Sequence, residues 1–181
     1  MTEAKHRETR CGFCAIIGAP NAGKSTLVNQ LTGSKVAIVS HKVQTTRARL
    51  RAIVMEGDAQ IVLVDTPGIF KPRRKLDTAM VANAWGGAGE ADAVVLLVDG
   101  RPGVTDDVTK IIDGLKAMNA KAMLAINKID LPAANVQKVK QDLLGQNVVL
   151  EEFGGQVLST AISAKKGTNI GAYNTLKGRK T

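Results

Sequence analysis

The chain has 181 residues, 44% of them hydrophobic, which argues against disorder and suffices for one domain with a substantial core. No apolar run approaches the roughly 20 residues that span a bilayer, and the charged residues 1–10 lack the apolar centre of a signal peptide, so we expect a cytoplasmic protein. The net charge of +9 favours a polyanionic partner, and with only 3% aromatic residues we expect contacts to phosphates rather than stacking on bases.

In chain order, residues 1–10 form a polar lead-in that we expect to be mobile, and residues 11–181 are expected to fold as a single domain. Apolar runs predict buried strands at residues 11–17, 60–64, 93–98, 122–126 and 156–162. Residues 49–55 alternate charged and apolar side chains, as a half-exposed strand does, and the turn at Gly57-Asp58 joins them to the next strand in a hairpin.

Helical segments are predicted between these strands, at residues 23–31, 76–88, 105–118, 134–144 and 169–180. Gly86 and Gly87 weaken the second of these helices, and residues 32–47 are expected to be a long, irregular connection. The alternation of strands and helices predicts a three-layer α/β fold, in which a mostly parallel six-stranded sheet carries helices on both faces.

Cys11 and Cys14 form a C-x-x-C pair, which raises the question of a redox or zinc site. Zinc needs a second pair of ligands, and the two histidines, His6 and His41, are far apart in the sequence. A thioredoxin-type pair opens a helix, whereas Cys14 continues into an apolar strand. We therefore expect two reduced cysteines that serve packing.

The strongest motif is G-x-x-x-x-G-K-S at residues 18–25, between the first strand and the first helix. Its glycines let backbone N–H groups point at phosphate oxygens, and the helix adds its positive N-terminal end. Lys24 would contact the β- and γ-phosphates, and Ser25 would place its hydroxyl on Mg²⁺. The predicted nucleotide contacts in this segment are Gly18, Asn21, Ala22, Gly23, Lys24, Ser25 and Thr26.

A second motif, Asp65-Thr66-Pro67-Gly68, directly follows a buried strand. The Asp65 carboxylate can hold Mg²⁺, usually through water, and Gly68 allows its N–H to approach the γ-phosphate closely. On its own the segment is equally well a strand-ending turn, because Asp, Pro and Gly favour turns. The phosphate-binding motif upstream favours the metal-binding interpretation.

A third motif, Asn127-Lys128-Ile129-Asp130, ends another strand and predicts which base is bound. The Asp130 carboxylate can accept both N1–H and the exocyclic amine of guanine, a pair of donors that adenine lacks. The Lys128 stem can lie along the ring face, and Asn127 can tie neighbouring loops together. After the last strand, Ser163-Ala164-Lys165 offers a backbone N–H to the guanine oxygen. GTP and GDP are therefore the predicted ligands.

These motifs follow one another as in the translation-factor-related GTPases, and residues 10–130 resemble the Era-like GTPases of ribosome assembly. Residues 18–29, Gln44-Thr45-Thr46-Arg47 and residues 64–70 carry the resemblance. It implies a P-loop GTPase domain, or G domain, that hydrolyses GTP with Mg²⁺ and associates with small-subunit ribosomal RNA.

The resemblance changes character in the second half of the chain. Residues 134–170 look more like the nucleotide-binding domain of translation initiation factor 2, which leaves open a chimeric or designed sequence. Era-like proteins continue into a KH domain that holds RNA. We expect no KH domain here, because the chain stops at Thr181 and contains no G-x-x-G loop of that kind.

The resemblance also indicates which residues would act in hydrolysis, namely Lys24, Thr46, Gly68 and Asn21. Thr46 corresponds to the mobile-loop threonine that completes a Mg²⁺ site with Ser25 and Asp65, and Thr45 is the alternative.

Two further positions affect the expected turnover. Ile69 stands where Ras-like enzymes carry a water-orienting glutamine, so slow intrinsic turnover is expected. Asn21 resembles the asparagine with which some relatives hold K⁺ near the phosphates. The basic residues 71–75 are either a solvated charge run or a phosphate contact controlled by the nucleotide.

Two other functions stay open at the level of sequence. The chain could be a guanine-nucleotide-binding module with little or no turnover, which single-turnover phosphate release would distinguish from a hydrolase. It could also be a P-loop kinase or ATPase, against which Asp130 argues, and which competition by GDP but not ATP would exclude.

Overall fold

The computed structural model describes residues 10–37, 39 and 49–170. In chain order its elements are β1 (Arg10–Gly18), α1 (Lys24–Thr32), β2 (Leu50–Glu56), β3 (Ala59–Asp65), α2 (Lys75–Gly89), β4 (Ala93–Asp99), α3 (Asp106–Ala117), β5 (Ala122–Asn127), α4 (Val136–Gly145), a 3₁₀ turn (Glu151–Phe153) and β6 (Ser159–Ala161).

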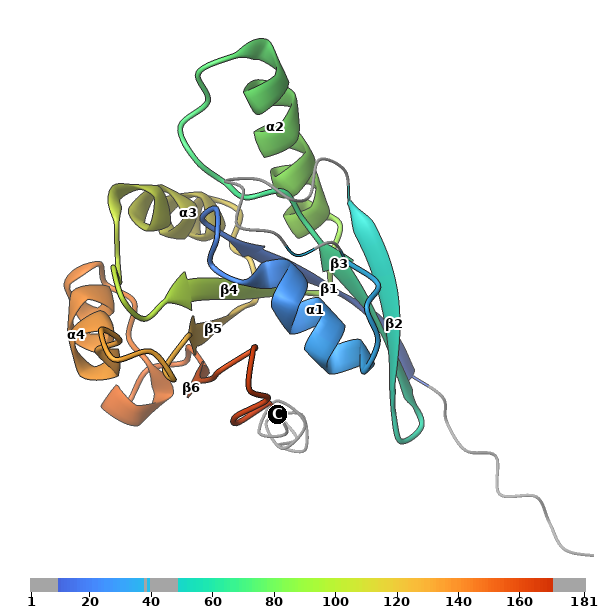
Figure 1. The fold of residues 1–181 in the computed structure, drawn as a ribbon. Coiled ribbons are helices and arrows are strands. Elements are labelled where there is room, and N and C mark those ends of the chain that lie inside the picture. The colour runs from blue at the N-terminus through green and yellow to red at the C-terminus, as the bar shows by residue number, and fades with distance from the viewer. Residues whose placement is uncertain (1–9, 38, 40–48, 171–181) are drawn as a thin grey trace, which may run out of the picture.

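The six strands form one sheet in the order β2-β3-β1-β4-β5-β6 (Figure 1). Every neighbouring pair is parallel except β2 and β3, which form the predicted antiparallel hairpin. The alternating strand β2 lies at the edge of the sheet, where one of its faces can remain exposed. The predicted three-layer α/β fold with a mostly parallel six-stranded sheet is confirmed.

Helices cover both faces of the sheet, because successive side chains of each strand point to opposite sides. Ala15 and Ile17 of β1 pack with α2, α3 and α4 in one core cluster. Ile16, between them, packs on the other face in a second cluster that contains Leu27 and Val28 of α1. The two clusters account for the apolar runs in the carboxyl-terminal half of β1 and along β4, where successive residues are buried on opposite faces.

Helix α2 is continuous over 15 residues, although the sequence predicted that Gly86 and Gly87 would weaken it. The glycines make room for Arg49, whose Nη2 atom would overlap a Cβ at Gly86. Arg49 donates to the Asn83 carbonyl at 2.9 Å and pairs with Glu90 at 2.6 Å. The glycine pair therefore permits a contact between α2 and the chain that leads into β2.

Most predicted boundaries fall within one residue of the structure, and two differ by more. Strand β6 has three residues rather than the seven predicted over 156–162, because the chain folds back on itself before it. In that fold Val157 forms a bridge with Leu150, and Gly155 lies so close to the Val149 carbonyl that a Cβ would overlap it. Helix α4 begins after Asn135, two residues later than predicted, since the Asn135 side chain caps it by accepting from the Lys138 N–H.

The cysteines and the chain ends bear on three other predictions. Neither cysteine is in a disulfide, but Cys11 is exposed and only Cys14 packs against the core, so the packing role holds for one of the two. Arg10 already belongs to β1 rather than to a mobile lead-in. Residues 1–9, most of the irregular connection at 32–47 and nearly all of the predicted helix at 169–180 lie outside the described residues. Within the described ranges, none of the helices combines the length and the apolar composition needed to cross a membrane.

Candidate functional site

The phosphate-binding motif forms the loop between β1 and α1, at the carboxyl edge of the sheet. Gly23 has φ +102°, a conformation that favours glycine, and a Cβ there would overlap the amide nitrogen of Asn127. A Cβ at Gly18 would lie 2.5 Å from the Leu97 carbonyl oxygen. Both glycines are thus required by close approaches of β4 and β5, as well as by the path of the loop itself.

Lys24, the first residue of α1, turns its side chain back into this loop and is only 7% exposed. Its Nζ donates to the carbonyl oxygens of Gly18 at 3.2 Å and Ala19 at 2.9 Å. Burial lowers the pKa of Lys24 to about 8, against the attraction of Asp65. Phosphate oxygens would be stronger acceptors for this ammonium than the two carbonyls.

Ser25 and Asp65, two of the predicted Mg²⁺ ligands, meet although they are 40 residues apart. The Ser25 hydroxyl donates to Asp65 Oδ2 at 2.7 Å, and both residues are buried. A hydroxyl and a carboxylate are hard oxygen ligands of the kind that Mg²⁺ takes, with phosphate and water completing its shell. Among the described residues no three His, Cys, Asp or Glu gather into a metal cluster.

The segment after Asp65 lies directly on the phosphate-binding loop. The Ile69 N–H donates to the Gly18 carbonyl at 3.0 Å, and a Cβ at Gly68 would lie 2.9 Å from Pro20 Cα. Thr66, which is fully buried, donates its hydroxyl to the Ile16 carbonyl. The Ile69 side chain is 4% exposed and packs in the core, so it faces away from any position from which it could orient water.

Asn127, the last residue of β5, joins three segments through its buried side-chain amide. Its Nδ2 donates to the Ala22 carbonyl at 2.8 Å, and its Oδ1 accepts from the Ala164 N–H at 2.9 Å. The predicted tie between neighbouring loops is therefore confirmed, and it connects the phosphate-binding loop to the segment after β6.

Asp130 and Ser163 come together from different loops, as the guanine motif requires. The Ser163 hydroxyl donates to Asp130 Oδ1 at 2.7 Å. This hydrogen bond lowers the pKa of the Asp130 carboxyl below its ordinary value, so the residue is a carboxylate at neutral pH. The N–H groups of Ser163 and Ala164 already donate to Thr168 and Asn127, which leaves the N–H of Lys165 as the candidate donor to a guanine oxygen.

Lys128 has φ +65°, which is uncommon for a residue with a side chain, and it reaches across to the phosphate-binding loop. Its Nζ donates to the Asn21 carbonyl and to Asp99 Oδ2, the latter at 2.7 Å. Asn21 also has a positive φ, of 61°. Asp99 is not among the site residues predicted from the sequence, although its position directly after the apolar run 93–98, at the same sheet edge as the motifs, is a signal that could have singled it out.

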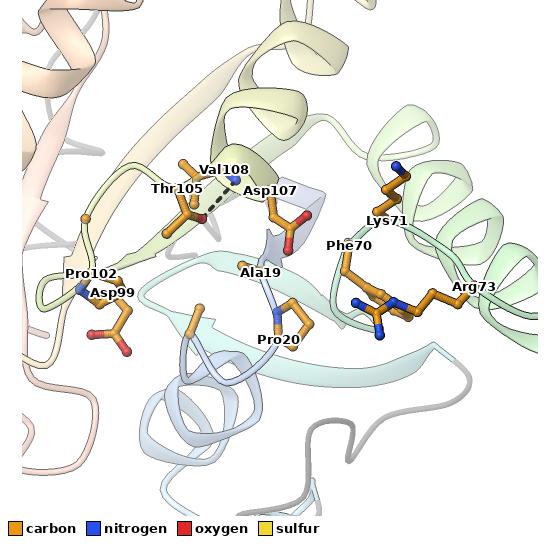
Figure 2. Close-up of a pocket in the computed structure, with 12 residues that line it drawn as sticks. Ala19, Pro20, Phe70, Lys71, Arg73, Asp99, Pro102, Thr105, Asp107 and Val108 are labelled. Carbon is orange, nitrogen blue, oxygen red and sulfur yellow. Dashed lines mark hydrogen bonds between the residues drawn. The ribbon is translucent and has the colours of Figure 1, made fainter.

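A cavity of about 620 Å³ opens beside the phosphate-binding loop (Figure 2). Asp99 and Pro102 lie at one end of it, Phe70, Lys71 and Arg73 at the other, and the loop passes between them. Asp107 and Val108 at the start of α3 complete the lining. The basic residues at 71–75 are exposed, and Lys71 and Arg73 line this cavity.

Other predicted site residues are placed less decisively. Thr26 lies half-buried in the first turn of α1, and Ala22 is buried beneath the loop. Thr45 and Thr46, the alternatives for the mobile-loop Mg²⁺ ligand, lie outside the described residues.

Comparison with known families decides where this arrangement belongs. A family model described as "50S ribosome-binding GTPase" matches residues 13–128, which include the phosphate-binding loop, the Asp65 segment and the first two residues of the third motif. The chain belongs to this GTPase family.

Curated relatives of this GTPase carry the predicted resemblance further. GTPase Era of Afipia carboxidovorans is 61% identical over 133 residues, covering 74% of this chain and 43% of the relative. GTPase Era of Dinoroseobacter shibae is 53% identical over 166 residues, covering 90% of this chain and 52% of the relative. The chain thus spans about half the length of these relatives. The second match extends into residues 134–170, so likeness to Era continues where the sequence also resembles initiation factor 2.

Solved structures give the same result for the fold. Era in complex with MgGDPNP and nucleotides 1506–1542 of 16S ribosomal RNA matches with a TM-score of 0.81 and 33% identity, over 94% of this chain and 56% of that one. A variant of Aquifex aeolicus Era bound to GDP and AlF₄⁻ matches with a TM-score of 0.79, also at 33% identity, over 93% and 56% of the two chains. The predicted likeness to Era-like GTPases is confirmed.

Proposed function

We propose that this chain is a G domain that binds GTP and GDP with Mg²⁺, hydrolyses GTP slowly, and acts as a cytoplasmic, ribosome-associated switch. The observation that carries the proposal is the side chain of Asn127, which bonds the phosphate-binding loop at Ala22 to the base-reading segment at Ala164. Phosphate and base recognition are built as one unit by this bridge.

In the proposed complex, Lys24 and the loop N–H groups bind the phosphates, while Asp130 and the Lys165 N–H read the guanine ring. Ser25 and Asp65 hold Mg²⁺ together with a mobile-loop threonine, Thr46 or Thr45. The ion would neutralise charge on the β- and γ-phosphates during transfer to water. Gly68, packed on Pro20, brings its N–H toward the γ-phosphate.

Base recognition is tested with the variant Asp130→Asn, which replaces an acceptor by an amide of the same size. Wild-type protein should bind GDP and not ADP. The variant should lose GDP and gain affinity for xanthosine diphosphate, whose ring offers an acceptor where guanine offers an amine. Asp113→Asn, a change in α3 away from these motifs, is the matched control. If the wild-type protein bound GDP and ADP equally, the proposed function would be refuted.

Hydrolysis is tested separately, by single-turnover release of phosphate from GTP. The burial of Ile69, where a water-orienting glutamine is found in Ras-like enzymes, favours one competing candidate, a binding module without turnover. Slow release that depends on Mg²⁺ supports the hydrolase, whereas tight binding with no release supports the module.

We also propose K⁺ as an aid to turnover, held through Asn21 at the exposed tip of the loop. Support comes from the resemblance of Asn21 to the K⁺-binding asparagine of some relatives. Turnover should be faster in KCl than in NaCl, and the difference should disappear in Asn21→Ala. Equal rates in the two salts would exclude this part of the proposal.

The ribosomal partner is proposed from the net charge of +9 and from the Era structure with a 16S ribosomal RNA segment. RNA containing nucleotides 1506–1542 is a suitable probe. Contacts to phosphates predict that binding weakens steeply with salt. Control by the nucleotide predicts different affinities with GDP and with a non-hydrolysable GTP analogue, because Lys71 and Arg73 lie only a few residues after Gly68.

A further inference from the structure

Lys128 has to be held in one position if its stem is to lie along a guanine ring. Its φ of +65° carries backbone strain, which persists only where surrounding contacts fix the residue. Two acceptors hold its ammonium group. One is the Asn21 carbonyl in the phosphate-binding loop, and the other is the Asp99 carboxylate at the end of β4.

Asp99 is itself fixed by a neighbour. Arg101 makes a two-pronged contact to it, from Nε to Oδ1 at 3.0 Å and from Nη2 to Oδ2 at 2.6 Å, and the Arg101 N–H adds a third bond. The Asp99 side chain is 12% exposed and that of Lys128 is 22% exposed, so water screens the pair only partly.

Protonation does not weaken this arrangement at neutral pH. Burial would raise the pKa of Asp99, but the hydrogen bonds from Arg101 and Lys128 outweigh it, and the pKa lies below its ordinary value. Asp99 therefore presents a full negative charge to the Lys128 ammonium. Lys128 and Arg101 both contact Oδ2 at bonding distance, so the carboxylate holds the two cations at once.

We propose that Asp99 is a positioning residue for guanine recognition, acting through Lys128, and that Arg101 holds Asp99 in place for this role. The proposal rests on the proposed nucleotide-binding function. Asp99 fixes the lysine before the base arrives, so that less side-chain freedom is lost on binding. Asp99 also faces the 620 Å³ cavity, at the end opposite Phe70 (Figure 2). It needs no contact with the nucleotide to act in this way.

A double-mutant cycle on GDP affinity tests the proposal with the whole chain, using Asp99→Asn, Lys128→Met and the combination. Asp99→Asn should weaken GDP binding roughly tenfold, as expected for losing one hydrogen bond between charged groups. In the Lys128→Met background the same change should alter affinity less than about twofold. Asp113→Asn, a change in α3 away from the cavity and the motifs, should leave affinity within about twofold.

The outcomes separate this inference from the function on which it depends. If wild-type protein fails to bind GDP, the proposed function itself fails. If wild-type protein binds and Asp99→Asn costs the same with and without the lysine, Asp99 is only structural and the inference is overturned. Should Asp99→Asn not fold, Arg101→Ala decides, because Arg101 is exposed and its loss leaves Asp99 present. It should weaken GDP binding about twofold to threefold in the presence of Lys128 and not in its absence.

Discussion

Asn127, Lys128 and Ser163 belong to the side of the site that we propose reads the base, here called the base-reading side. Their side chains bond to groups on other loops and so join those loops together. On the phosphate-reading side, Lys24 bonds to carbonyls of its own loop, and Ser25 bonds to the carboxylate of Asp65. Guanine could bind with the base-reading contacts intact. Phosphate and Mg²⁺ would have to replace the contacts of Lys24 and Ser25.

This difference assigns different roles to the two sides. The contacts of Asn127 contribute to the folding stability of the domain, because they satisfy buried backbone groups. The phosphate-reading contacts are exchanged on binding, so that side is where nucleotide state can alter conformation. Variants on the two sides should therefore affect affinity and stability in different proportions.

The largest expected effect is that of Lys24→Met on affinity. Removal of the ammonium should weaken GDP binding about 100-fold, since the charge-assisted contact to the β-phosphate is lost. Stability should not fall with it. Burial lowers the pKa of Lys24 to about 8, so its charge opposes folding in full below pH 8, and this penalty disappears as the pH rises toward the ordinary value of 10.5.

At pH 7 the free energy of unfolding of Lys24→Met should therefore equal or exceed that of the wild type, by up to roughly 3 kcal/mol. Fluorescent-GDP titration and urea denaturation measure the two quantities, and Lys138→Met on the exposed face of α4 is the matched control. A clear loss of stability in Lys24→Met would mean that the phosphate-reading side is also structural.

Asn127→Ala should show the opposite balance. It leaves the buried Ala22 carbonyl and Ala164 N–H without their partner, which should lower the free energy of unfolding by about 2–4 kcal/mol. GDP affinity should fall as well, because the two halves of the site are no longer joined. Urea denaturation without nucleotide measures the effect, and Asn83→Ala, exposed in α2, should stay within about 0.5 kcal/mol of the wild type. Unchanged stability would show that the bridge does not contribute to folding.

Gly23→Ala tests the junction between the two sides. Its φ of +102° is unfavourable for alanine, and the new Cβ would displace the Asn127 amide. We expect a loss of about 1–3 kcal/mol in unfolding free energy together with weaker GDP binding. Gly145→Ala is the control, since it ends α4 with open space around it and should be neutral or slightly stabilising. If Gly23→Ala changed affinity alone, the two sides would be energetically separate.

The sequence predicted the strands, helices and motifs wherever the information is local. The hydrophobic period and the capping residues of an element involve only residues that are close in the chain. Thr105, for example, caps α3 by accepting from the Val108 N–H three residues later. The glycines and lysine of the phosphate-binding motif likewise occur at fixed spacing.

What the sequence did not reveal depends on partners distant in the chain. Gly86 and Gly87 look like helix breakers until Arg49 is seen beside them. In the sequence Asp99 looks like any acidic residue at a strand end, and only the structure shows its contact with Lys128, which follows β5. The shortening of β6 follows from the fold-back of Val157 onto Leu150, which no local pattern indicates.

The smallest expected effect on GDP affinity is that of Ser163→Ala, which separates the role of the Ser163 hydroxyl from that of its backbone. Ser163→Ala keeps the backbone and removes the hydrogen bond that lowers the pKa of Asp130. A carboxyl with a depressed pKa keeps its charge as the pH falls, so in the variant the pKa rises toward its ordinary value and protonation begins at higher pH. At pH 7, where Asp130 is charged in both proteins, GDP affinity should fall only about twofold to fivefold, through looser orientation of the carboxylate.

The ratio of wild-type to variant affinity should then grow as the pH is lowered from 7 to the ordinary carboxyl pKa of 3.8. Ser159→Ala in β6 controls for loss of a hydroxyl near the same segment. A ratio that stays constant with pH would assign the effect of Ser163 to positioning alone, and no effect at any pH would remove Ser163 from the base-reading side. The Asp130 carboxylate would then depend for its orientation on its own backbone and on the nearby charges of Lys165 and Lys166.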